Sequence, residues 1–305
     1  MSSFLRDTIM TTSDSIGAWE DIFYTSHDGL TLYARHYPGK GKSGLRPALC
    51  LPGLTRNSKD FHVLASHLAA QGREVYALDF RGRGRSARDP DWRNYTPFME
   101  LLDTQNFMTI AGLHEAALIG TSRGGIVTML LAVMRPTAIG VCILNDIGPE
   151  LETAGLARII GYVGKTPVPA DWKEAAEIAK RMNQQFFTDT DDAEWEAVAR
   201  QWFADVDGRP GPDYDPQLAK TMEEIDLTSR IPDMWPQFKA LAHAPTMVIR
   251  GENSDLLSEE TFARMQASHP DVTPLTVRDE GHAPFLRDTP TLDRIAEFLA
   301  RADRR

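Results

Sequence analysis

One serine in this chain of 305 residues stands in a setting that suits a nucleophile. Gly120, Ser122 and Gly124 match the pattern G-x-S-x-G between an apolar stretch that predicts a strand and a stretch that predicts a helix. Glycines are needed there because a sharp strand-to-helix turn leaves no room for larger side chains. Such a turn raises the serine hydroxyl above the sheet, and the helix N-terminus favours developing negative charge. The pattern alone also fits an ordinary glycine-rich turn, so its partners must decide.

The first partner is a histidine, since a serine hydroxyl attacks a carbonyl carbon only when a base removes its proton. Among eight histidines, His282 follows a predicted strand and precedes the last predicted helix, in a loop that can reach the carboxyl edge of a sheet. Four others fit structural positions on a helix, in an early hairpin or beside a turn proline: His62, His67, His36 and His269. We therefore expect His282 to be the general base.

The second partner is an acidic side chain that fixes the histidine tautomer and stabilises its cation. Asp255 follows the predicted strand that ends near Arg250, so it should lie at the same edge of the sheet. Asp146, at the end of another predicted strand, is the second candidate, and Glu252 stands closer to its strand end than the role requires. We expect Asp255 to be the acid and Asp146 to be the alternative.

Carbonyl attack also places negative charge on oxygen, and two backbone N–H groups must stabilise it. The N–H of Arg123 directly follows the serine, and the loop after an early apolar strand should provide the second, for which Leu54 is the best candidate. No cysteine pair has the spacing of metal ligands. We expect neither a metal nor an organic cofactor.

The elements that would position these groups alternate between strands and helices. Two strands joined by a tight Asp-Gly turn come first, and apolar strands and helical stretches then follow one another. The predicted strands cover 19–26, 31–37, 47–51, 74–79, 116–121, 138–145, 246–250 and 272–277, and the helices lie near 61–69, 97–112, after Ser122 and over 289–302. This order predicts an α/β fold with a mostly parallel sheet and helices on both faces.

The alternation stops between residues 148 and 237. This stretch has amphipathic helical segments, turn-forming pieces and no convincing strand, and 209–216 is its clearest irregular part. We interpret 148–237 as a helical cap inserted into one core domain made of 1–147 and 238–305. Its aromatic residues are suited to an apolar pocket or to the cap's own core: Tyr162, Phe186, Phe187, Trp195, Trp202 and Trp235.

Five short stretches appear in a characteristic order. They are Pro52-Gly53-Leu54, Asp79 to Ser86, Gly120 to Gly124, Gly251 to Asp255, and Gly281-His282. Together they resemble the α/β-hydrolase fold family, of the esterase, lactonase and carbon–carbon hydrolase type, over nearly all of the chain after residue 19. The order serine, acid, histidine agrees with that family.

The resemblance implies a serine hydrolase that cleaves a carboxylic ester or lactone through an acyl-enzyme on Ser122. An amide or carbon–carbon bond hydrolase is the alternative, as is a non-catalytic receptor for a small ligand. Dehalogenases and epoxide hydrolases of this fold carry an aspartate at the nucleophile position, so Ser122 argues against those chemistries.

Two residues depart from the family pattern. Pro52 stands where many relatives have a histidine before the glycine of the oxyanion loop, which leaves the backbone donors in place. Arg123 follows the nucleophile, where relatives often have an apolar residue or glutamine. Its charge could hold a substrate carboxylate, but we expect it to pair with an acid such as Asp146.

Composition narrows the remaining classes of partner. A net charge of −10 argues against a nucleic-acid binder, and we interpret the basic run Arg81, Arg83, Arg85 and Arg88 as a solvated turn or local ion pairs. Cys50 and Cys142 lie in apolar runs and should be buried, inert thiols. The sequence has no stretch typical of a secretory signal or membrane span, so we expect a cytoplasmic protein that acts on a small molecule. The oligomeric state stays open, a homodimer included.

Overall fold

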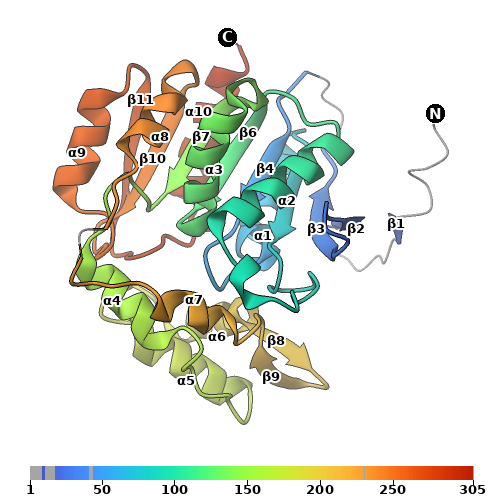
Figure 1. The fold of residues 1–305 in the computed structure, drawn as a ribbon, viewed down its shortest axis with the longest axis vertical. Helices are drawn as coiled ribbons and strands as arrows, with labels where there is room; N and C mark the ends of the chain where they lie inside the picture. Colours follow the sequence, from blue (N-terminus) through green and yellow to red (C-terminus); the bar gives the residue numbers. More distant parts are fainter. Residues whose placement is uncertain (1–8, 11–17, 41–43, 230, 305) are drawn as a thin grey trace.

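The computed structural model describes residues 9–10, 18–40, 44–229 and 231–304, and within them one large sheet runs through the molecule (Figure 1). Nine strands are ordered β1-β2-β3-β5-β4-β6-β7-β10-β11. Their bounds are β1 Ile9–Met10, β2 Glu20–Thr25, β3 Thr31–Tyr37, β4 Ala48–Leu51, β5 Val75–Asp79, β6 Ala116–Thr121, β7 Ile139–Asn145, β10 Thr246–Gly251 and β11 Val272–Val277. In this order, the neighbouring strands from β5 to β11 pair in parallel. The strands β1, β2 and β3 pair antiparallel with one another, and β3 also pairs antiparallel with β5. The predicted α/β fold with a mostly parallel sheet is confirmed.

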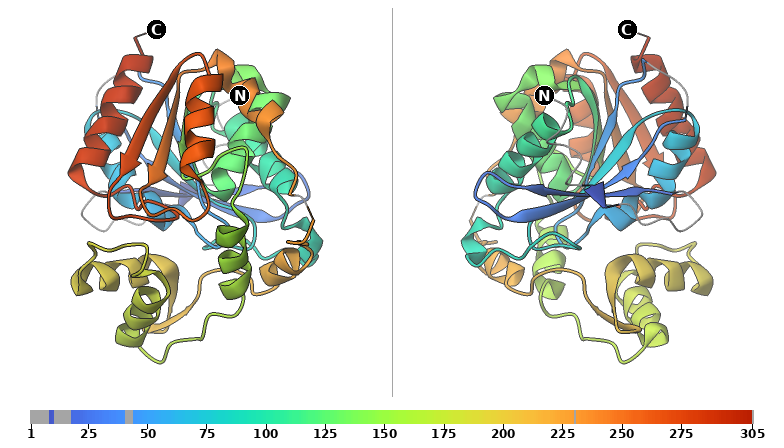
Figure 2. Two further views of the ribbon diagram at one scale, coloured as in Figure 1. Left: turned by 90° about the vertical axis from the view of Figure 1, so that its left-hand side faces the viewer. Right: turned by 90° about the vertical axis from the view of Figure 1, so that its right-hand side faces the viewer.

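Helices cover both faces of the sheet (Figure 2). The strands between them alternate their side chains, so that Leu49 and Leu51 of β4 join one core while Cys50 joins the other. On the first face lie α2 Pro97–Ile110, α3 Arg123–Met134, α8 Trp235–Lys239 and α9 Glu259–Ser268, and on the second α1 His62–Ala70 and α10 Thr289–Ala302. Short 3₁₀ turns span Ser58–Phe61, Trp92–Asn94, Pro136–Ala138 and Ala240–His243. No helix among the described residues has the length and apolarity needed to cross a membrane.

Residues 148–237, which we call the cap segment, leave the sheet after β7 and return before β10. Most of the segment lies beyond one end of the sheet (Figures 1 and 2). It contains α4 Thr153–Tyr162, α5 Trp172–Asn183, α6 Asp192–Trp202, β8 Phe203–Val206, β9 Arg209–Pro212, α7 Leu218–Glu223 and the start of α8. The expected boundary at 237 falls inside α8. This helix packs against α3 and so belongs to the core domain rather than to the cap.

The cap segment contains a β-hairpin that the sequence did not predict. β8 and β9 pair antiparallel, with Ala204 opposite Gly211, and the turn uses Asp207 and Gly208 at positive φ. The Asp205 carboxylate accepts a hydrogen bond from the Gly208 N–H at 2.7 Å. The prolines of β9 suggested an irregular loop, but an edge strand tolerates proline on its unpaired side.

The expectation of a solvated basic turn is wrong for Arg81 and Arg83, whose side chains are buried. Arg81 forms ion pairs with Asp28, Asp89 and Asp103 at 2.6–2.9 Å. The ion-pair half of the prediction is therefore confirmed. Cys50 and Cys142 are buried free thiols, as expected, and burial raises the pKa of both.

Candidate active site

Ser122 occupies a tight turn between β6 and α3, with a positive φ of 49°. A Cβ added at Gly120 would lie 2.6 Å from the carbonyl carbon of Gly124. A Cβ at Gly124 would meet the backbone of Leu51 in β4. Glycine is required at both positions because the helix starts directly against the sheet. The turn thus raises Ser122 at the carboxyl edge of the parallel strands.

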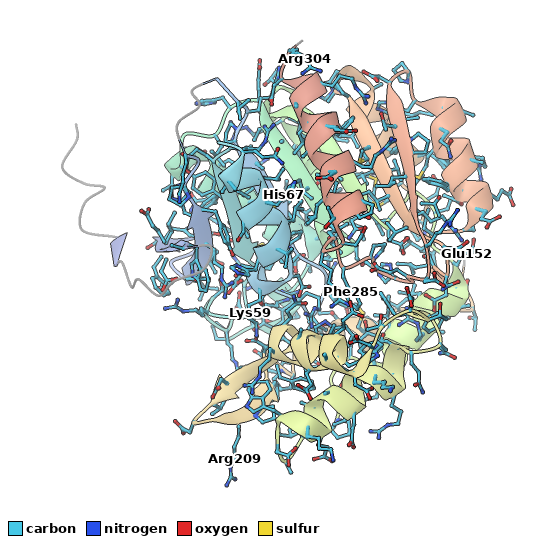
Figure 3. The ribbon with its side chains drawn as sticks, turned by 180° about the vertical axis from the view of Figure 1, so that it is seen from behind. Lys59, His67, Glu152, Arg209, Phe285 and Arg304 are labelled. Atoms are coloured by element: carbon cyan, nitrogen blue, oxygen red, sulfur yellow. The ribbon has the colours of Figure 1, made fainter. Side chains whose placement is uncertain are left out.

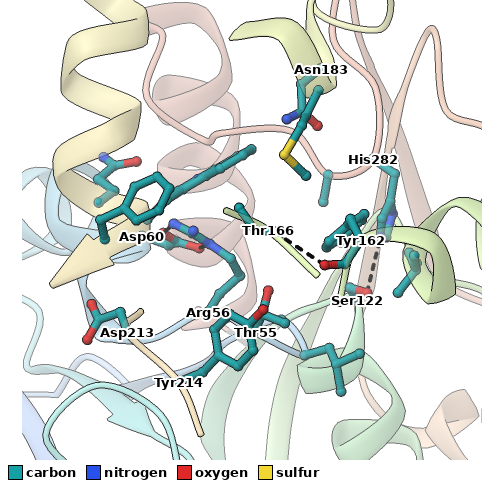
Figure 4. Close-up of a pocket in the computed structure, with 18 of the residues that line it drawn as sticks. Thr55, Arg56, Asp60, Ser122, Tyr162, Thr166, Asn183, Asp213, Tyr214 and His282 are labelled. Atoms are coloured by element: carbon teal, nitrogen blue, oxygen red, sulfur yellow. Dashed lines mark hydrogen bonds and ion pairs between the residues drawn. The ribbon is translucent and has the colours of Figure 1, made fainter. Parts of the chain in front are cut away.

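His282 approaches the serine from the loop after β11. Its Nε2 lies 2.9 Å from Ser122 Oγ (Figure 4). Only 7% of the His282 side chain is exposed, so the pair is largely shielded from water. The structure therefore brings together the serine and the histidine that the sequence singled out.

Asp146 contacts the other ring nitrogen of this histidine. Its Oδ2 lies 2.9 Å from His282 Nδ1, and its side chain is buried. Two further donors hold the carboxylate: the Gly251 N–H on Oδ1 at 2.8 Å and the Ser254 hydroxyl on Oδ2 at 2.6 Å. The line Ser122, His282, Asp146 is continuous in hydrogen bonds.

The expectation that Asp255 orients the histidine is wrong in this structure. Both Asp255 oxygens bind Arg158 of α4, at 2.6 and 2.8 Å. The loop after β10 passes close under α4, since a Cβ at Gly155 would lie 2.5 Å from the Asp255 carbonyl oxygen. This path directs Ser254 towards Asp146 and Asp255 towards the cap segment. The second candidate, Asp146, has the geometry that was expected of Asp255.

The two expected oxyanion donors both lie near the serine. Arg123 is the first residue of α3, so its N–H has no carbonyl four residues earlier within the helix. Leu54 borders the same cavities as Ser122, in a turn closed by an Arg56 N–H to Gly53 carbonyl bond of 3.1 Å. The Leu54 carbonyl accepts a hydrogen bond from Arg83 Nε at 2.8 Å. That bond fixes the loop behind the site.

Arg123 pairs with Glu100 of α2 rather than with Asp146, so the expected partner was wrong. Arg123 Nε lies 3.4 Å from Glu100 Oε2, and Arg83 binds Glu100 Oε1 at 2.7 Å. Glu100 and Arg83 are both buried, and burial of the Arg83 guanidinium is the main cause that lowers the pKa of Arg83. Sequence reasoning missed Glu100 and Arg83 because their partners come from distant segments. A run of arginines followed by an acid in the next predicted helix was the available signal.

Two cavities meet at the serine. The first, of about 270 Å³, reaches β8 and β9 and contains polar side chains, among them Thr55, Arg56 and Asp60 (Figure 4); we call it the hairpin cavity. The second, of about 440 Å³, is lined mostly by aliphatic side chains, and we call it the apolar cavity. Ser122 and Leu54 border both.

The aromatic residues of the cap segment divide between these cavities and packing. Tyr162 and Trp202 line the hairpin cavity. Phe187 stacks on Phe285, with ring centroids 4.4 Å apart, and Trp195 packs beside them. Figure 3 shows Phe285 between the sheet and the cap segment. Phe186 lies under the Arg158 guanidinium, and the Trp235 indole donates a hydrogen bond to Glu150.

One group of side chains among the described residues has the composition of a cation site: His27, Asp28 and Asp103. Both carboxylates already bind the Arg81 guanidinium, which supplies the positive charge that a metal would bring. The group borders neither cavity at Ser122. It therefore fits a structural ion-pair cluster.

Comparisons with known proteins identify the family and the fold. Residues 48–294 match the model of the alpha/beta hydrolase family. The chain is 31% identical over 266 residues to a 3-hydroxybutyrate-oligomer hydrolase of Cupriavidus necator, covering 84% of this chain and 89% of the relative. It is 26% identical to the sn-1-specific diacylglycerol lipase ABHD11 of Mus musculus, covering 85% and 83%. A crystal structure of an alpha/beta hydrolase from Novosphingobium aromaticivorans superposes with a TM-score of 0.88 at 38% identity, covering 94% and 100%.

Proposed function

Because this chain belongs to the alpha/beta hydrolase family, we propose that it hydrolyses carboxylic esters through an acyl-enzyme on Ser122. The observation that carries the proposal is the line of hydrogen bonds from Ser122 Oγ through His282 to Asp146, with 2.9 Å on each side of the imidazole. A nucleophile, a base and an orienting acid are the groups that acyl transfer requires.

In the first half of the reaction, Ser122 Oγ attacks the ester carbonyl carbon while His282 Nε2 takes the hydroxyl proton. Buried Asp146 stabilises the imidazolium that forms and keeps the Nδ1 proton directed towards itself. The carbonyl oxygen becomes negative, and the N–H groups of Leu54 and Arg123 stabilise it. His282 then gives its proton to the leaving alkoxide, and the alcohol departs.

In the second half, a water molecule replaces the alcohol. His282 removes a proton from this water as it attacks the acyl-enzyme carbonyl carbon, and the same N–H groups stabilise the second oxyanion. The Ser122–acyl bond breaks, the serine regains its proton from His282, and a carboxylic acid leaves. Besides the ester and this water molecule, the steps use only Ser122, His282, Asp146 and the two backbone N–H groups.

The relatives support an ester as the substrate class. Oligomers of 3-hydroxybutyrate and diacylglycerols, the substrates in the relatives' names, both contain carboxylic ester bonds. A lactone is an internal ester and would react through the same steps. Amide or carbon–carbon hydrolysis and ligand binding without turnover are the competing outcomes of the test.

The test is the hydrolysis rate of wild type and Ser122→Ala on p-nitrophenyl esters, a 3-hydroxybutyrate dimer, a lactone and an anilide. We expect ester turnover in wild type and a loss of about 10⁴-fold or more in Ser122→Ala, because the nucleophile is removed. The elbow tolerates alanine, so circular dichroism should be unchanged. Ser268→Ala, at an exposed serine at the end of α9, is the matched control and should retain full activity. Equal rates in Ser122→Ala and wild type would remove Ser122 from the mechanism.

A further inference from the structure

The two cavities at the nucleophile differ in which catalytic group borders them. Ser122 and Leu54 border both, whereas His282 borders the hairpin cavity and Arg123 borders the apolar cavity. Among the described residues that line the apolar cavity, His282 is absent. The site is therefore asymmetric about the serine.

This asymmetry matters because each tetrahedral intermediate holds three groups besides the serine oxygen. The negative oxygen must face the N–H donors, and the leaving oxygen must lie near His282 Nε2, from which it receives its proton. The remaining group is the acyl chain. A leaving oxygen placed near His282 would lie on the hairpin-cavity side, and the acyl chain would then point to the apolar-cavity side.

On the basis of the proposed esterase function, we propose that the apolar cavity binds the acyl chain and that the hairpin cavity binds the alcohol. The substrate class that fits is an ester of an apolar acyl chain of medium length with a polar alcohol. This assignment goes beyond the serine chemistry, because it fixes which end of the ester enters which cavity.

The lining of the apolar cavity fits a hydrocarbon chain. Aliphatic and methionine side chains from α3, α4, α7 and the adjoining loops form its wall: Ile126, Ile147, Leu156, Ile159, Met222 and Ile225. The Asp226 carboxylate at its rim is exposed and accepts hydrogen bonds from Thr228 and Ser229. Arg123 is paired with Glu100. The wall thus offers apolar contact and little unsatisfied charge.

The size of this cavity sets the acyl length. A cavity of about 150 Å³ holds a six-carbon ring, so about 440 Å³ has room for a flexible chain on the order of six to ten carbons. Each methylene that enters an apolar wall should raise kcat/KM by about fourfold. Specificity should therefore rise with acyl length and then reach a plateau.

The hairpin cavity has groups suited to hydroxyls. Thr55, Arg56 and Asp60 line it, and the Arg56 guanidinium is bound to the Asp60 carboxylate. This pair is only partly exposed, and its oxygen and nitrogen atoms provide both acceptors and donors. A polar alcohol can exchange hydrogen bonds with such a pair, which the apolar cavity does not offer, while apolar side chains such as Trp202 and Phe285 line other parts of the hairpin cavity.

The experiment measures kcat/KM along two substrate series. The first varies the acyl chain of p-nitrophenyl esters from acetate to dodecanoate, and the second keeps octanoate and compares methyl with glyceryl esters. Ile225→Trp narrows the apolar cavity, and Val168→Trp, at a residue 67% exposed, narrows the hairpin cavity as its matched control.

We expect wild type to gain about fourfold per methylene up to a plateau between hexanoate and decanoate. Ile225→Trp should flatten this rise, so that kcat/KM falls much more for octanoate than for acetate. Val168→Trp should keep the rise and lower the glyceryl-to-methyl ratio. Ile225→Ala, which enlarges the cavity, should move the plateau to longer chains and serves if the tryptophan variant does not fold.

A flat wild-type profile, or a rise that Val168→Trp removes and Ile225→Trp leaves intact, would overturn the assignment of the two cavities while leaving the esterase intact. Absence of Ser122-dependent turnover on every ester would instead contradict the proposed function, and the assignment with it. Acetate turnover that depends on Ser122 separates these two failures.

Discussion

Two loops at the carboxyl edge of the sheet carry an aspartate each, and they hold it differently. Asp146 directly follows β7, is buried and binds His282, Ser254 and the Gly251 N–H. Asp255 lies four residues beyond β10, is partly exposed and binds Arg158 of the cap segment. β7 and β10 are neighbouring parallel strands, so both acids start from the same edge. The sheet brings an acid to the edge, and the length and path of the loop decide what it contacts.

The largest effect should come from Asp146→Asn. The asparagine amide has no negative charge to stabilise the imidazolium, and it would favour the wrong histidine tautomer. The value of kcat should therefore fall by about 10⁴-fold. Rates on p-nitrophenyl butanoate, with folding checked by circular dichroism, measure this. Near-wild-type turnover in Asp146→Asn would show that Asp146 has no catalytic role, and the contrast between Asp146 and Asp255 would then fail.

Ser254→Ala should have the next largest effect, because the Asp146 carboxylate would lose a donor at 2.6 Å. A hydrogen bond to a charged group contributes about 1.5–3 kcal/mol, which predicts a fall in kcat/KM of about tenfold or more. Ser258→Ala is the matched control, since it removes the side-chain cap of α9 from the same loop without contacting Asp146. Equal losses of kcat/KM in the two variants would instead attribute the loss to disordering of the loop and not to the missing hydrogen bond on Asp146.

Asp255→Asn should leave kcat within about threefold of wild type, because Asp255 contacts the cap segment and not the histidine. Its ion pair with Arg158 is partly exposed, so the pair should contribute about 1 kcal/mol to the free energy of unfolding. A double-mutant cycle with Arg158→Gln in urea measures that coupling. A loss in kcat as large as that of Asp146→Asn would return Asp255 to the catalytic role.

The smallest effect concerns a third acid near the histidine, Glu280. Burial raises its pKa from 4.5 to about 7, although the Phe285 N–H donates to its Oε2 at 2.8 Å. A raised carboxyl pKa stabilises the folded protein while the group is protonated. That contribution is present below pH 4.5 and is lost as the pH rises through about 7.

Glu280→Gln should therefore lose less stability than wild type between pH 5 and 8. Urea unfolding at four pH values in this interval gives the comparison, and the difference between the two proteins should grow with pH in favour of the variant. Parallel curves would show that Glu280 ionises in the folded protein as easily as in the unfolded chain. In that case, Glu280 would be grouped with partly exposed Asp255 rather than with buried Asp146.

The sequence predicted the sheet, Ser122 and His282 because each depends on local order. Alternating strands and helices fix the sheet, glycines fix the elbow, and the loop after the last strand leads to the histidine. The acid could not be chosen in this way, since Asp146 and Asp255 both follow strands of that edge. The choice depends on how the loop after β10 packs under α4, which is a contact between distant segments.

Burial of charge was the other feature that local patterns did not give. Arg81 and Arg83 are long cations in a glycine-rich stretch, and such residues are usually exposed. Their burial requires Asp28, Asp103 and Glu100, which come from an early turn and from α2. The β8–β9 hairpin was missed for a similar reason, because its prolines are tolerated only through its position at an edge.

The position of the cap segment between two neighbouring strands has an evolutionary consequence. The chain leaves the sheet at Asn145 and re-enters it at Thr246, beside the strand it left. One contiguous stretch therefore contributes most of the walls of the two cavities at Ser122, while Ser122, Asp146 and His282 belong to the surrounding core. Exchange of this one internal gene segment between relatives would replace most of the cavity walls and leave Ser122, Asp146 and His282 in place, so new specificities can arise without many separate substitutions.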